Sequence, residues 1–520
     1  MKRFLILTIG LVFIHLSAIA QLTEQQQIQK LNYVYQQIRN NYVDDVPLEP
    51  LVEEAIIATL HELDPHSKYL TREQMEAMQQ RISGEFAGIG IRYLIHNDTM
   101  VVRNTMANSP AQRANILPND RITSINGQSI IGLSPDSIAT LLKGKLGTEI
   151  TQQIIRRGTD KPLTIKLKRN NIESSAISAA YRIDNVGYIA VSAFSRTADS
   201  EFLAAYRKLG KIESLIIDLR DNGGGAITSA IDLTGLFLRK GDVIVSTEGR
   251  SNTITYDKKR DGYITDTPIV VIINENSASA SELFAGAIQD HDRGVIIGHT
   301  SYGKGLVQKV IDLKDGSAIT LTVARYKTPS GRIIQRPYSM GEGEKYERDT
   351  MRYMHPDSIP HDSKLLYTTL KRGRKVYGGG GITPDIYIDT DSVKLSQTLI
   401  KAHYSKPIFE HTAVDIWDCT SYEELLKQYP TVEEFNNNYM LSSNIMELFY
   451  RNSELSAEDL TPHDKELITT KILALMAERL YGDSARYYIY NMRYDIMTRR
   501  ALEIATDNTL YEQILNSACK

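Results

Sequence analysis

The 520-residue sequence contains only two cysteines and one tryptophan, and it has no marked excess of one charge. Two cysteines, Cys419 and Cys519, cannot form a disulfide framework, although one bridge between them and two free thiols are both compatible with the sequence. The 60 Lys and Arg residues nearly balance the 63 Asp and Glu residues, which gives a net charge of −3. Such a balance does not predict binding to nucleic acid.

Long apolar runs are also scarce, and the most pronounced one lies at the N-terminus. Lys2 and Arg3 precede an apolar stretch over residues 4–16, and Ala18-Ile19-Ala20 follows it. This order is typical of a secretory signal peptide with a small-x-small cleavage site. We therefore expect residues 1–20 to be a signal peptide, with a short anchor helix as the alternative. No later run reaches the roughly 18 residues of a membrane span, so we expect a mature chain without one, secreted across the cytoplasmic membrane into the periplasm.

Glycine is almost missing from the last quarter of the chain. Of the 33 glycines, only Gly482 follows residue 391. We interpret residues 391–520 as a helical extension, in which ILALMAERL (472–480) is the clearest amphipathic stretch. Residues 21–83 also contain little glycine, and LVEEAIIATLHEL (51–63) carries apolar residues at helical spacing, which predicts an N-terminal helical region.

Between these two regions the pattern of the sequence changes twice. Residues 84–170 alternate short β-like runs with Gly, Asn-Gly and Pro-Asn-Asp turns, which is typical of a small β-rich module. Within residues 171–390, strands and helices alternate. Predicted strands cover 186–194, 214–219, 268–273 and 295–297, and predicted helices cover 198–209, 226–238 and 281–290. This alternation predicts an α/β domain with a parallel or mixed sheet covered by helices.

Two loops at strand ends are candidates for chemistry, because functional groups in α/β proteins collect where strands lead into helices. The first is DLRDNGGG, residues 218–225. Its three glycines allow backbone N–H groups to point at an anion or at a developing oxyanion. A flexible turn is the alternative interpretation.

The second loop is NENSASASE, residues 274–282, which leads from a strand into a helix. Ser279 lies where backbone N–H groups and the helix dipole favour negative charge, which suits a nucleophile whose attack creates an oxyanion. Ser279 and Glu282 also have the spacing of a capping box, in which the serine would only cap the helix. Spacing alone does not decide between these two roles.

Lys304 lies in a third segment, GHTSYGKG (298–305), between two glycines. The segment matches a P-loop except that Gly305 replaces the hydroxyl residue that would hold Mg²⁺. It also contains S-x-x-K, although its glycines disfavour the helical turn that this motif needs. A buried lysine with a lowered pKa can instead act as the base for a serine nucleophile. A solvated surface lysine, and a serine paired with His291 or His299, are the alternatives.

The segment SASASE (277–282), followed by YGKGLVQ (302–308), resembles the carboxyl-terminal processing proteases, the tail-specific serine peptidases of family S41. Further segments resemble this family in the expected order. They are LDPHSKYL (63–70), GEFAGIGI (84–91), SPAQRANILPNDRITSING (109–127), IIRRG (154–158), DLRDNGGG (218–225), TPSGRIIQ (328–335) and GGITPD (380–385). The resemblance covers residues 25–390 and leaves the function of residues 391–520 open.

The resemblance assigns catalytic roles to three side chains. It implies that Ser279 is the nucleophile, Lys304 is the general base and Gln308 supports the lysine. No metal or organic cofactor is implied.

The resemblance also implies an oxyanion hole and a fold. The backbone N–H groups of Gly223 and Ala280 correspond to the oxyanion hole, and Gly224 is an adjacent candidate. The implied core is a crotonase/ClpP-like α/β fold. Asn276 departs from the family, in which glycine is common at this position, and this departure removes no catalytic atom.

Residues 84–170 resemble the PDZ domain of the same family. In such domains a peptide lies as an added strand, and N–H groups of a glycine-containing loop bind its terminal carboxylate. Gly88, Ile89 and Gly90 are the candidate loop, with a plain β-hairpin loop as the alternative.

The complete prediction is an α/β protease core with an inserted PDZ domain and helical terminal regions. After the signal peptide, the parts are 21–83 (helical), 84–170 (PDZ), 171–390 (S41 core) and 391–520 (helical extension). The expected function is that of a secreted serine endopeptidase that processes or degrades proteins from their C-terminal tails. Its expected partners are unstructured C-terminal tails and a second copy in a homodimer, but not nucleic acid. A catalytically inactive, PDZ-based peptide-binding scaffold is the alternative.

Overall fold

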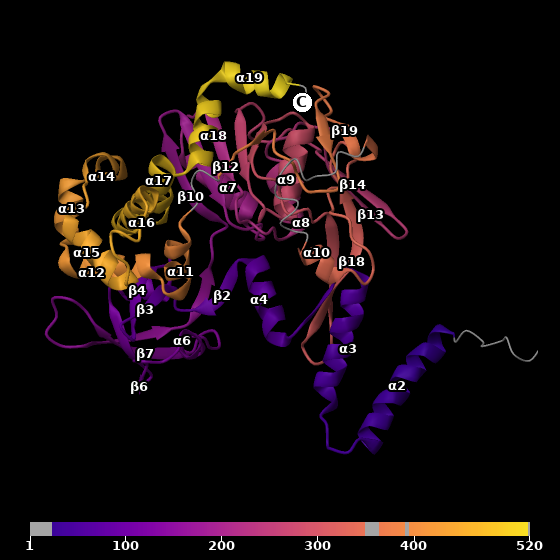
Figure 1. Cartoon of the computed structure of the whole chain (residues 1–520), viewed down its shortest axis with the longest axis horizontal. Coiled ribbons are helices and arrows are strands. Elements are labelled where there is room, and N and C mark those ends of the chain that lie inside the picture. Colours follow the sequence, from indigo (N-terminus) through magenta and orange to yellow (C-terminus); the bar gives the residue numbers. More distant parts are fainter. Residues whose placement is uncertain (1–22, 349–362, 391–394, 518–520) are drawn as a thin grey trace, which may run out of the picture.

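A computed structural model describes residues 23–348, 363–390 and 395–517 (Figure 1). The predicted signal peptide, residues 1–20, and Cys519 lie outside the described residues, and Cys419 is a free, exposed thiol. Along the described residues, no helix combines the length and the apolar character needed to cross a membrane.

A six-stranded sheet forms the centre of the molecule. In spatial order its strands are β10 (Ile177–Ile183), β11 (Val186–Val191), β12 (Ser214–Asp218), β15 (Ile269–Ile273), β16 (Val295–Gly298) and β21 (Ile386–Tyr387). Neighbours from β11 to β21 are parallel, and β10 is antiparallel to β11. The strands from β11 to β16 are buried along their whole length. Such strands need cover on both faces of the sheet.

Different parts of the chain cover the two faces. On one face, α7 (Ala198–Lys208), α8 (Ile227–Thr234) and α9 (Ala280–Asp290) pack against alternate residues of the strands. On the other face, α18 (Ile496–Thr506) and α19 (Asn508–Asn516) contribute Met497, Ile504 and Tyr511 to a second core cluster. The C-terminal extension therefore completes the layered core (Figure 1).

A second, antiparallel sheet lies beside the first and carries the lysine segment. Its strands are β1 (Lys68–Leu70), β13 (Val243–Gly249), β14 (Thr253–Asp257), β17 (Leu306–Asp312) and β18 (Ala318–Lys327). β1 pairs with β18, so the N-terminal region contributes a strand that its helical pattern did not predict. The small elements α10 (Gly343–Arg348), η3 (Ser363–Leu365), β19 (Leu366–Thr368) and β20 (Lys375–Tyr377) follow this sheet in the chain.

The predicted β-rich module has its own sheet and its own core. In spatial order the sheet contains β3 (Ile91–His96), β4 (Thr99–Thr105), β5 (Arg121–Ile125), β7 (Glu149–Ile155) and β8 (Leu163–Lys168), with β6 (Gln128–Ser129) paired to β5. The helices are α5 (Pro110–Arg113) and α6 (Pro135–Leu142). A ribbon of β2 (Glu85–Gly88) and β9 (Asn170–Glu173) connects the module to the rest of the chain.

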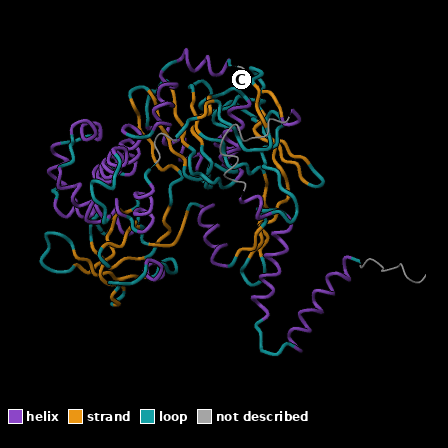
Figure 2. The backbone as a smooth tube through the Cα atoms, viewed as in Figure 1, coloured by secondary structure: helices purple, strands orange, loops and turns teal. Residues whose placement is uncertain are grey.

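Both terminal regions are helical, as the sequence predicts (Figure 2). The N-terminal helices are α2 (Glu24–Asn41), α3 (Leu48–Leu63) and α4 (Arg72–Ser83), and α2 and α3 project from the body of the molecule. The C-terminal helices before α18 are α11 (Gln397–Ser405), α12 (Ile408–Cys419), α13 (Tyr422–Gln428), α14 (Val432–Asn438), α15 (Ser443–Ser453), α16 (Pro462–Tyr481) and α17 (Asp483–Arg493). They form a core cluster of their own next to the β-rich module.

Candidate active site

Ser279 lies at a sharp bend between strand β15 and helix α9. It is the residue before the first turn of α9, and its backbone has φ of +56° and ψ of −108°. A positive φ is uncommon for a residue with a side chain, and it persists only where the surrounding structure enforces it. The bend leaves Ser279 partly exposed, while every residue of α9 is buried.

The two neighbouring serines are engaged in the structure of the loop. Ser277 Oγ donates to the carbonyl of Leu219 at 2.8 Å, and Ser281 Oγ donates to the carbonyl of Asn222 at 2.8 Å. Both serines are fully buried. They join the serine loop to the glycine loop, and Ser279 is the serine that faces outward between them.

The glycine loop approaches Ser279 closely. A Cβ atom at Gly224 would lie 2.9 Å from Ser279 Cβ and 3.0 Å from Ala280 N, and the backbone there has φ of +99°, so only glycine fits. Gly224 N–H donates to Asn222 Oδ1. Within the described part of the chain, the N–H groups of Gly223 and Ala280 have no acceptor. These two groups are therefore available to an oxyanion beside Ser279.

Polar side chains hold the two loops in register. Asp221 Oδ1 accepts hydrogen bonds from Asn274 Nδ2 at 2.9 Å and from Asn276 Nδ2 at 2.8 Å. Asn274 Oδ1 in turn accepts the backbone N–H of Asp221. Asn276 thus adds a bond between the loops.

Lys304 and Gln308 are hydrogen-bonded to each other. Lys304 lies just before β17, and its Nζ donates to Gln308 Oε1 at 2.8 Å. Gln308 Nε2 donates to the carbonyl of His66, which belongs to the LDPHSKYL segment. Asp64 fixes that segment by accepting the backbone N–H groups of His66 and Ser67, each at 2.8 Å. No hydrogen bond joins Ser279 Oγ to Lys304 Nζ across the described residues.

The buried carboxylate of Glu282 connects the serine loop to the lysine loop. Glu282 Oε2 accepts the backbone N–H groups of both Ser279, at 2.7 Å, and Lys304, at 2.8 Å. Glu282 Oε1 accepts Ser301 Oγ and Gly303 N–H, each at 2.6 Å. The predicted contact between Glu282 and the start of the helix therefore exists, and it does more than stabilise a helix end.

Tyr326 makes a second connection between the same two loops. Its hydroxyl lies 3.0 Å from the carbonyl of Ser279 and 2.9 Å from the carbonyl of Lys304. With the Glu282 carboxylate, this hydroxyl fixes the backbones of the serine and the lysine relative to each other. The spacing of the motifs gave no signal for Tyr326, because it lies on β18, far from both loops in sequence.

Burial sets the electrostatics of the site. Burial, followed by the positive charge of Lys68, lowers the pKa of Lys304 from its usual value of 10.5. Burial raises the pKa of Glu282, although its four hydrogen bonds oppose this effect. Burial and the nearby Lys304 charge lower the pKa of His66 to about 3, so its ring is neutral. A lowered pKa increases the neutral fraction of a lysine at a given pH, and the neutral amine is the form that can accept a proton.

The alternative motifs do not form the sites that they would need. Residues 301–305 have no regular secondary structure and lead into strand β17, so neither the helix of a P-loop nor the helical turn of S-x-x-K is present in this segment. His291 lies at the far end of α9 and its Nε2 bonds the carbonyl of Val243. His299 is held between Glu275 and the carbonyl of Ile388. Neither histidine is hydrogen-bonded to Ser279.

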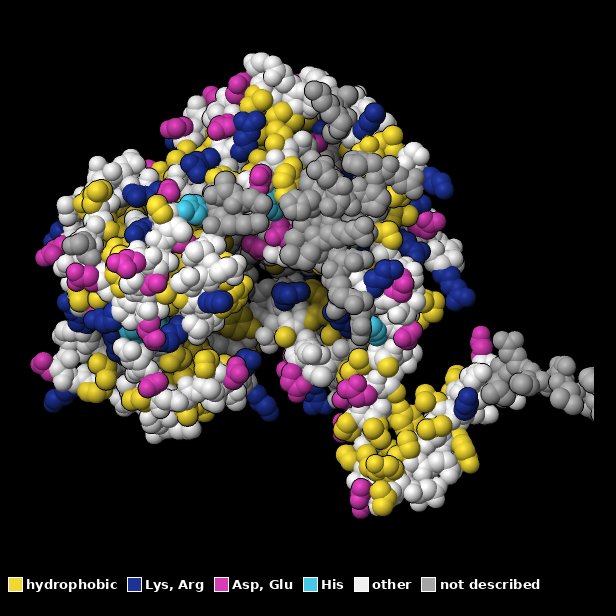
Figure 3. Space-filling model, viewed as in Figure 1, with side chains coloured by type: hydrophobic (Ala, Val, Ile, Leu, Met, Phe, Trp, Pro, Cys, Tyr) yellow, Lys and Arg dark blue, Asp and Glu magenta, His cyan; other side chains and the backbone are white. Residues whose placement is uncertain are grey.

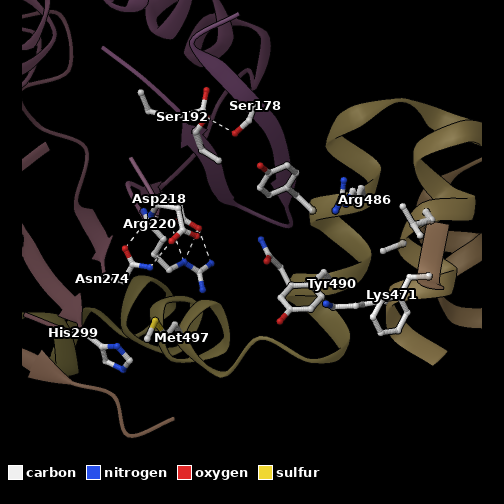
Figure 4. A pocket seen from close by; sticks show the side chains of 18 of the residues that line it. Ser178, Ser192, Asp218, Arg220, Asn274, His299, Lys471, Arg486, Tyr490 and Met497 are labelled. Carbon is white, nitrogen blue, oxygen red and sulfur yellow. Dashed lines mark hydrogen bonds and ion pairs between the residues drawn. The ribbon is translucent and has the colours of Figure 1, made fainter. Parts of the chain in front are cut away.

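A cavity of about 640 Å³ lies behind the strand ends, between the central sheet and α16 to α18 (Figure 4). Ser279, Lys304 and Gln308 do not line it. Arg220, from the glycine loop, lies at its wall and donates to Asp218 and to Asp495 of the C-terminal extension, each at 2.6 Å. The extension therefore supports the loop that carries Gly223, a connection that no sequence pattern indicated.

Comparison with known proteins gives three matches to family models. They are peptidase family S41 over residues 185–339, a PDZ domain over residues 87–167 and the "activating protease CtpB N-terminal domain" over residues 14–74. A carboxy-terminal-processing protease of Bartonella bacilliformis is 38% identical over 319 residues, which cover 60% of this chain and 73% of the relative. A probable CtpA-like serine protease of Staphylococcus aureus is 32% identical over 391 residues, which cover 72% and 76%.

Among solved structures, a photosystem II D1 C-terminal processing protease is 22% identical, with a TM-score of 0.35, over 72% of this chain and 95% of that one. The sequence matches define a serine-type peptidase that carries a PDZ domain. The chain belongs to peptidase family S41, among the carboxy-terminal-processing proteases. The resemblance identified from the sequence is confirmed.

Proposed function

We propose that the chain is an endopeptidase that cleaves proteins recognised by their C-terminal tails, with Ser279 as nucleophile and Lys304 as general base. The observation that carries the proposal is the Glu282 carboxylate, which holds the Ser279 and Lys304 backbones through one oxygen atom. The buried, pKa-lowered lysine beside a partly exposed serine supports the same roles.

Acylation and deacylation use the same two side chains. Ser279 Oγ attacks the carbonyl carbon of the scissile peptide bond, and its proton passes to neutral Lys304 Nζ. The C–N bond then breaks, and Lys304 gives this proton to the leaving amine. Water attacks the resulting ester, Lys304 accepts a proton from the water, and the carboxylic product leaves as Ser279 regains its proton. Gln308 positions Lys304 through the hydrogen bond to its Nζ.

The N–H groups of Gly223 and Ala280 stabilise the negative charge of the tetrahedral intermediate. Both groups lack an acceptor among the described residues, and the Ala280 group also lies at the N-terminus of α9, whose dipole favours an anion. A donor of this kind contributes on the order of 3 kcal/mol to the stability of the transition state. Gly224 fits less well, because its N–H already donates to Asn222.

The PDZ domain binds the substrate's C-terminus in this proposal. Gly90 has φ of +74°, and a Cβ atom there would lie 2.2 Å from Ser109 Cβ, so the loop requires glycine. Across the described residues, neither Ile89 N–H nor Gly90 N–H has an acceptor. Both can donate to a terminal carboxylate while the tail extends along strand β3.

The cellular location, the core fold and the oligomeric state belong to the same proposal. The apolar segment in residues 4–16 supports a signal peptide and secretion to the periplasm. Parallel strands with helices on both faces, beside a second sheet, support a crotonase/ClpP-like core.

The projecting N-terminal helices support a homodimer. On α2, Ile28, Leu31 and Val34 recur at a spacing of three residues, and all three are exposed. Figure 3 shows hydrophobic side chains gathered on this projecting pair of helices. A second copy would cover this face, and sedimentation equilibrium of the mature chain measures whether it does.

The alternative, an inactive PDZ scaffold, is not favoured, because the relatives are peptidases and the candidate site retains its nucleophile, base and oxyanion donors. The test is the cleavage of an unstructured protein by Ser279→Ala, compared with Ser277→Ala and Ser281→Ala, which keep the proposed nucleophile, lose only a bond between the loops and should be much milder. We expect Ser279→Ala to lower kcat by at least about 10³-fold with an unchanged melting temperature. Wild-type turnover by Ser279→Ala would exclude Ser279 as the nucleophile.

A further inference from the structure

Strand β3 is the open edge of the PDZ sheet, and only alternate residues offer backbone groups to an added strand. β3 pairs on one side with β4 and lies at the end of the strand order. Gly90 O accepts Met106 N–H at 2.9 Å on the inner side. The register shifts between Arg92 and Tyr93 by one extra residue on β4, which leaves the alternation of β3 unbroken, so the carbonyls of residues 92, 94 and 96 also face inward. Those of Ile91, Tyr93 and Ile95 face the open edge.

The C-terminal extension is bound to this end of the PDZ domain by one face of helix α12. His411, Asp415 and Asp418 are spaced i, i+4 and i+7, which places them on the same side of the helix. Asp415 accepts His96 Nε2 at 3.0 Å, and Asp418 accepts Asn119 Nδ2 at 2.6 Å. These contacts hold α12 across the end of β3.

Two further helices of the extension bind the same domain. Asp483, at the start of α17, accepts a hydrogen bond from Arg92 Nη1 at 2.8 Å, and Glu478 of α16 pairs with Arg103. The surface of the extension is acidic at these contacts and that of the PDZ domain is basic, so the two surfaces are complementary.

His411 occupies a backbone acceptor on the open edge. Its Nε2–H donates to the carbonyl of Ile95 at 2.9 Å, and its ring lies against the ring of His96 at 4.8 Å. Ile95 is the third outward-facing residue from the Gly88–Gly90 loop, after Ile91 and Tyr93. A tail that enters at the loop therefore pairs with two outward-facing residues and meets an occupied acceptor at the third.

We propose that His411 closes the outer end of the peptide groove, so that a substrate tail adds to β3 over only about its last four residues. The tail then leaves the sheet before it reaches Ile95. His411 is thus a residue of the C-terminal extension that determines how much of the substrate the PDZ domain recognises. This inference rests on the proposed binding of the tail by the PDZ domain.

The test measures how affinity depends on the length of the tail. The protein is full-length Ser279→Ala, which should not cleave the probe. The probes are N-acetylated peptides with a common apolar four-residue C-terminus, extended at the N-terminal end by zero, two, four or six Ala-Ser residues. We expect the Kd to change by less than twofold after the first four residues. A steady gain in affinity up to eight residues would overturn the inference.

Removing the imidazole should lengthen the recognised tail. In the Ser279→Ala background, His411→Ala frees the Ile95 carbonyl, and one further strand hydrogen bond gives roughly three- to tenfold tighter binding of the eight-residue peptide. Binding of the four-residue peptide should stay the same. Asp483→Asn is the matched control, because it removes the charge from another contact between the extension and the PDZ domain but leaves Ile95 covered. If the affinity of both variants stopped rising at the same peptide length, His411 would be excluded as the residue that limits the length of the recognised tail.

Hydrogen exchange shows which backbone amides of β3 pair with the peptide, which affinity alone does not show. The eight-residue peptide should slow exchange at the Tyr93 amide in both proteins, and at the Ile95 amide only in His411→Ala. Protection of the Ile95 amide in the protein that retains His411 would overturn the inference. A four-residue peptide with an amidated C-terminus separates the two proposals. Equal binding of the acid and the amide contradicts recognition of the terminal carboxylate by the PDZ domain. Binding that depends on the carboxylate but keeps strengthening with peptide length contradicts only the role of His411.

Discussion

A single side chain, that of Glu282, joins the two loops of the candidate site. Its carboxylate is fully buried and accepts four hydrogen bonds, two of them from the backbones of Ser279 and Lys304. A buried carboxylate without such donors would be very costly, so the loops and the carboxylate stabilise one another. The alignment of serine and lysine therefore depends on a third side chain, and the charge of that side chain depends on both loops.

The proposed role of Lys304 as a base predicts that its charge alone does not support activity. Lys304→Arg keeps a positive charge but cannot lose its proton near neutral pH. We expect it to lower kcat by about 10³-fold, as much as Lys304→Ala does. Steady-state cleavage of an unstructured protein measures this, with Lys309→Arg on the adjoining strand β17 as the control.

The pH profile gives an independent check on the same residue. Because burial lowers the pKa of Lys304, the neutral form becomes populated below its usual value of 10.5, and the wild-type rate should rise with pH into the mildly alkaline range. A plateau that begins near pH 6.5 and is lost in His299→Ala would point to a histidine base instead.

His66 predicts a loss of stability in acid. Its pKa is about 3 in the folded chain, against 6.5 in an unfolded one, because its ring is buried near Lys304. Between these values the unfolded state binds a proton that the folded state does not, so stability is complete above pH 6.5 and falls as the pH falls. His66→Gln should reduce the slope of the free energy of unfolding against pH, between pH 5 and 6.5, by up to about 1.4 kcal/mol per pH unit. Denaturant unfolding at pH 7, 6 and 5 measures it, and equal slopes for the two proteins would contradict the assignment.

At the scale of elements, the glycine loop depends on helix α18 from the other end of the chain. Asp495 precedes α18 and binds Arg220, which also pairs with Asp218 at the end of β12. Tyr188 on β11 donates to the same Asp218. Strand, loop and helix thus meet in one buried ionic cluster a few residues before Gly223.

Breaking this cluster should therefore affect both stability and catalysis. Asp495→Ala leaves the Arg220 charge buried with one partner, which costs on the order of 3 kcal/mol. We expect a clear fall in melting temperature and in kcat, with a smaller change in KM. Asp483→Ala is the comparison, because its pair with Arg92 is about half exposed and should contribute less than about 1 kcal/mol. Equal melting temperatures for the two variants would contradict a structural role for Asp495.

At the scale of the whole molecule, the C-terminal extension connects the two functional domains. It covers one face of the protease sheet through α18 and α19, and it binds the PDZ domain through α12, α16 and α17. Besides the β2–β9 ribbon, contacts from residues that the family models do not match therefore hold the PDZ domain beside the protease core.

Recognition of the tail predicts a strong dependence on the substrate's terminal carboxylate. Amidation of the C-terminus removes the charge and one of the two acceptor oxygens, so the N–H groups of Ile89 and Gly90 can no longer both be paired with a carboxylate. This costs on the order of 1–3 kcal/mol, so the full-length protein should cleave the amidated form of an unstructured peptide roughly five- to a hundredfold less efficiently. The measurement is kcat/KM for the acid and the amide, and equal values would contradict tail recognition while leaving the chemistry of Ser279 intact.

The sequence by itself determined the local features of this protein. Strand and helix alternation predicted the central sheet, because apolar strands between helices can be buried in few other ways. Turn residues and short β-like runs marked the PDZ region, and glycine depletion marked the helical extension. Ser279, Lys304 and Gln308 were predicted as site residues because they lie in short motifs that resemble those of the family. The strand β1 was not predicted, since three residues are too few for a periodic pattern.

Only the tertiary structure decided how these parts act together. The contacts of Glu282 with the lysine loop, of Tyr326 with both loops and of Asp495 with Arg220 join residues far apart in the chain, and a single sequence has no periodicity that reports such pairs. The capping-box spacing could not separate a helix cap from a nucleophile, because both place a serine at the same helix end. The role of the extension was undetermined for the same reason: amphipathic helices reveal that they pack, but the surface that they cover depends on how the complete chain folds.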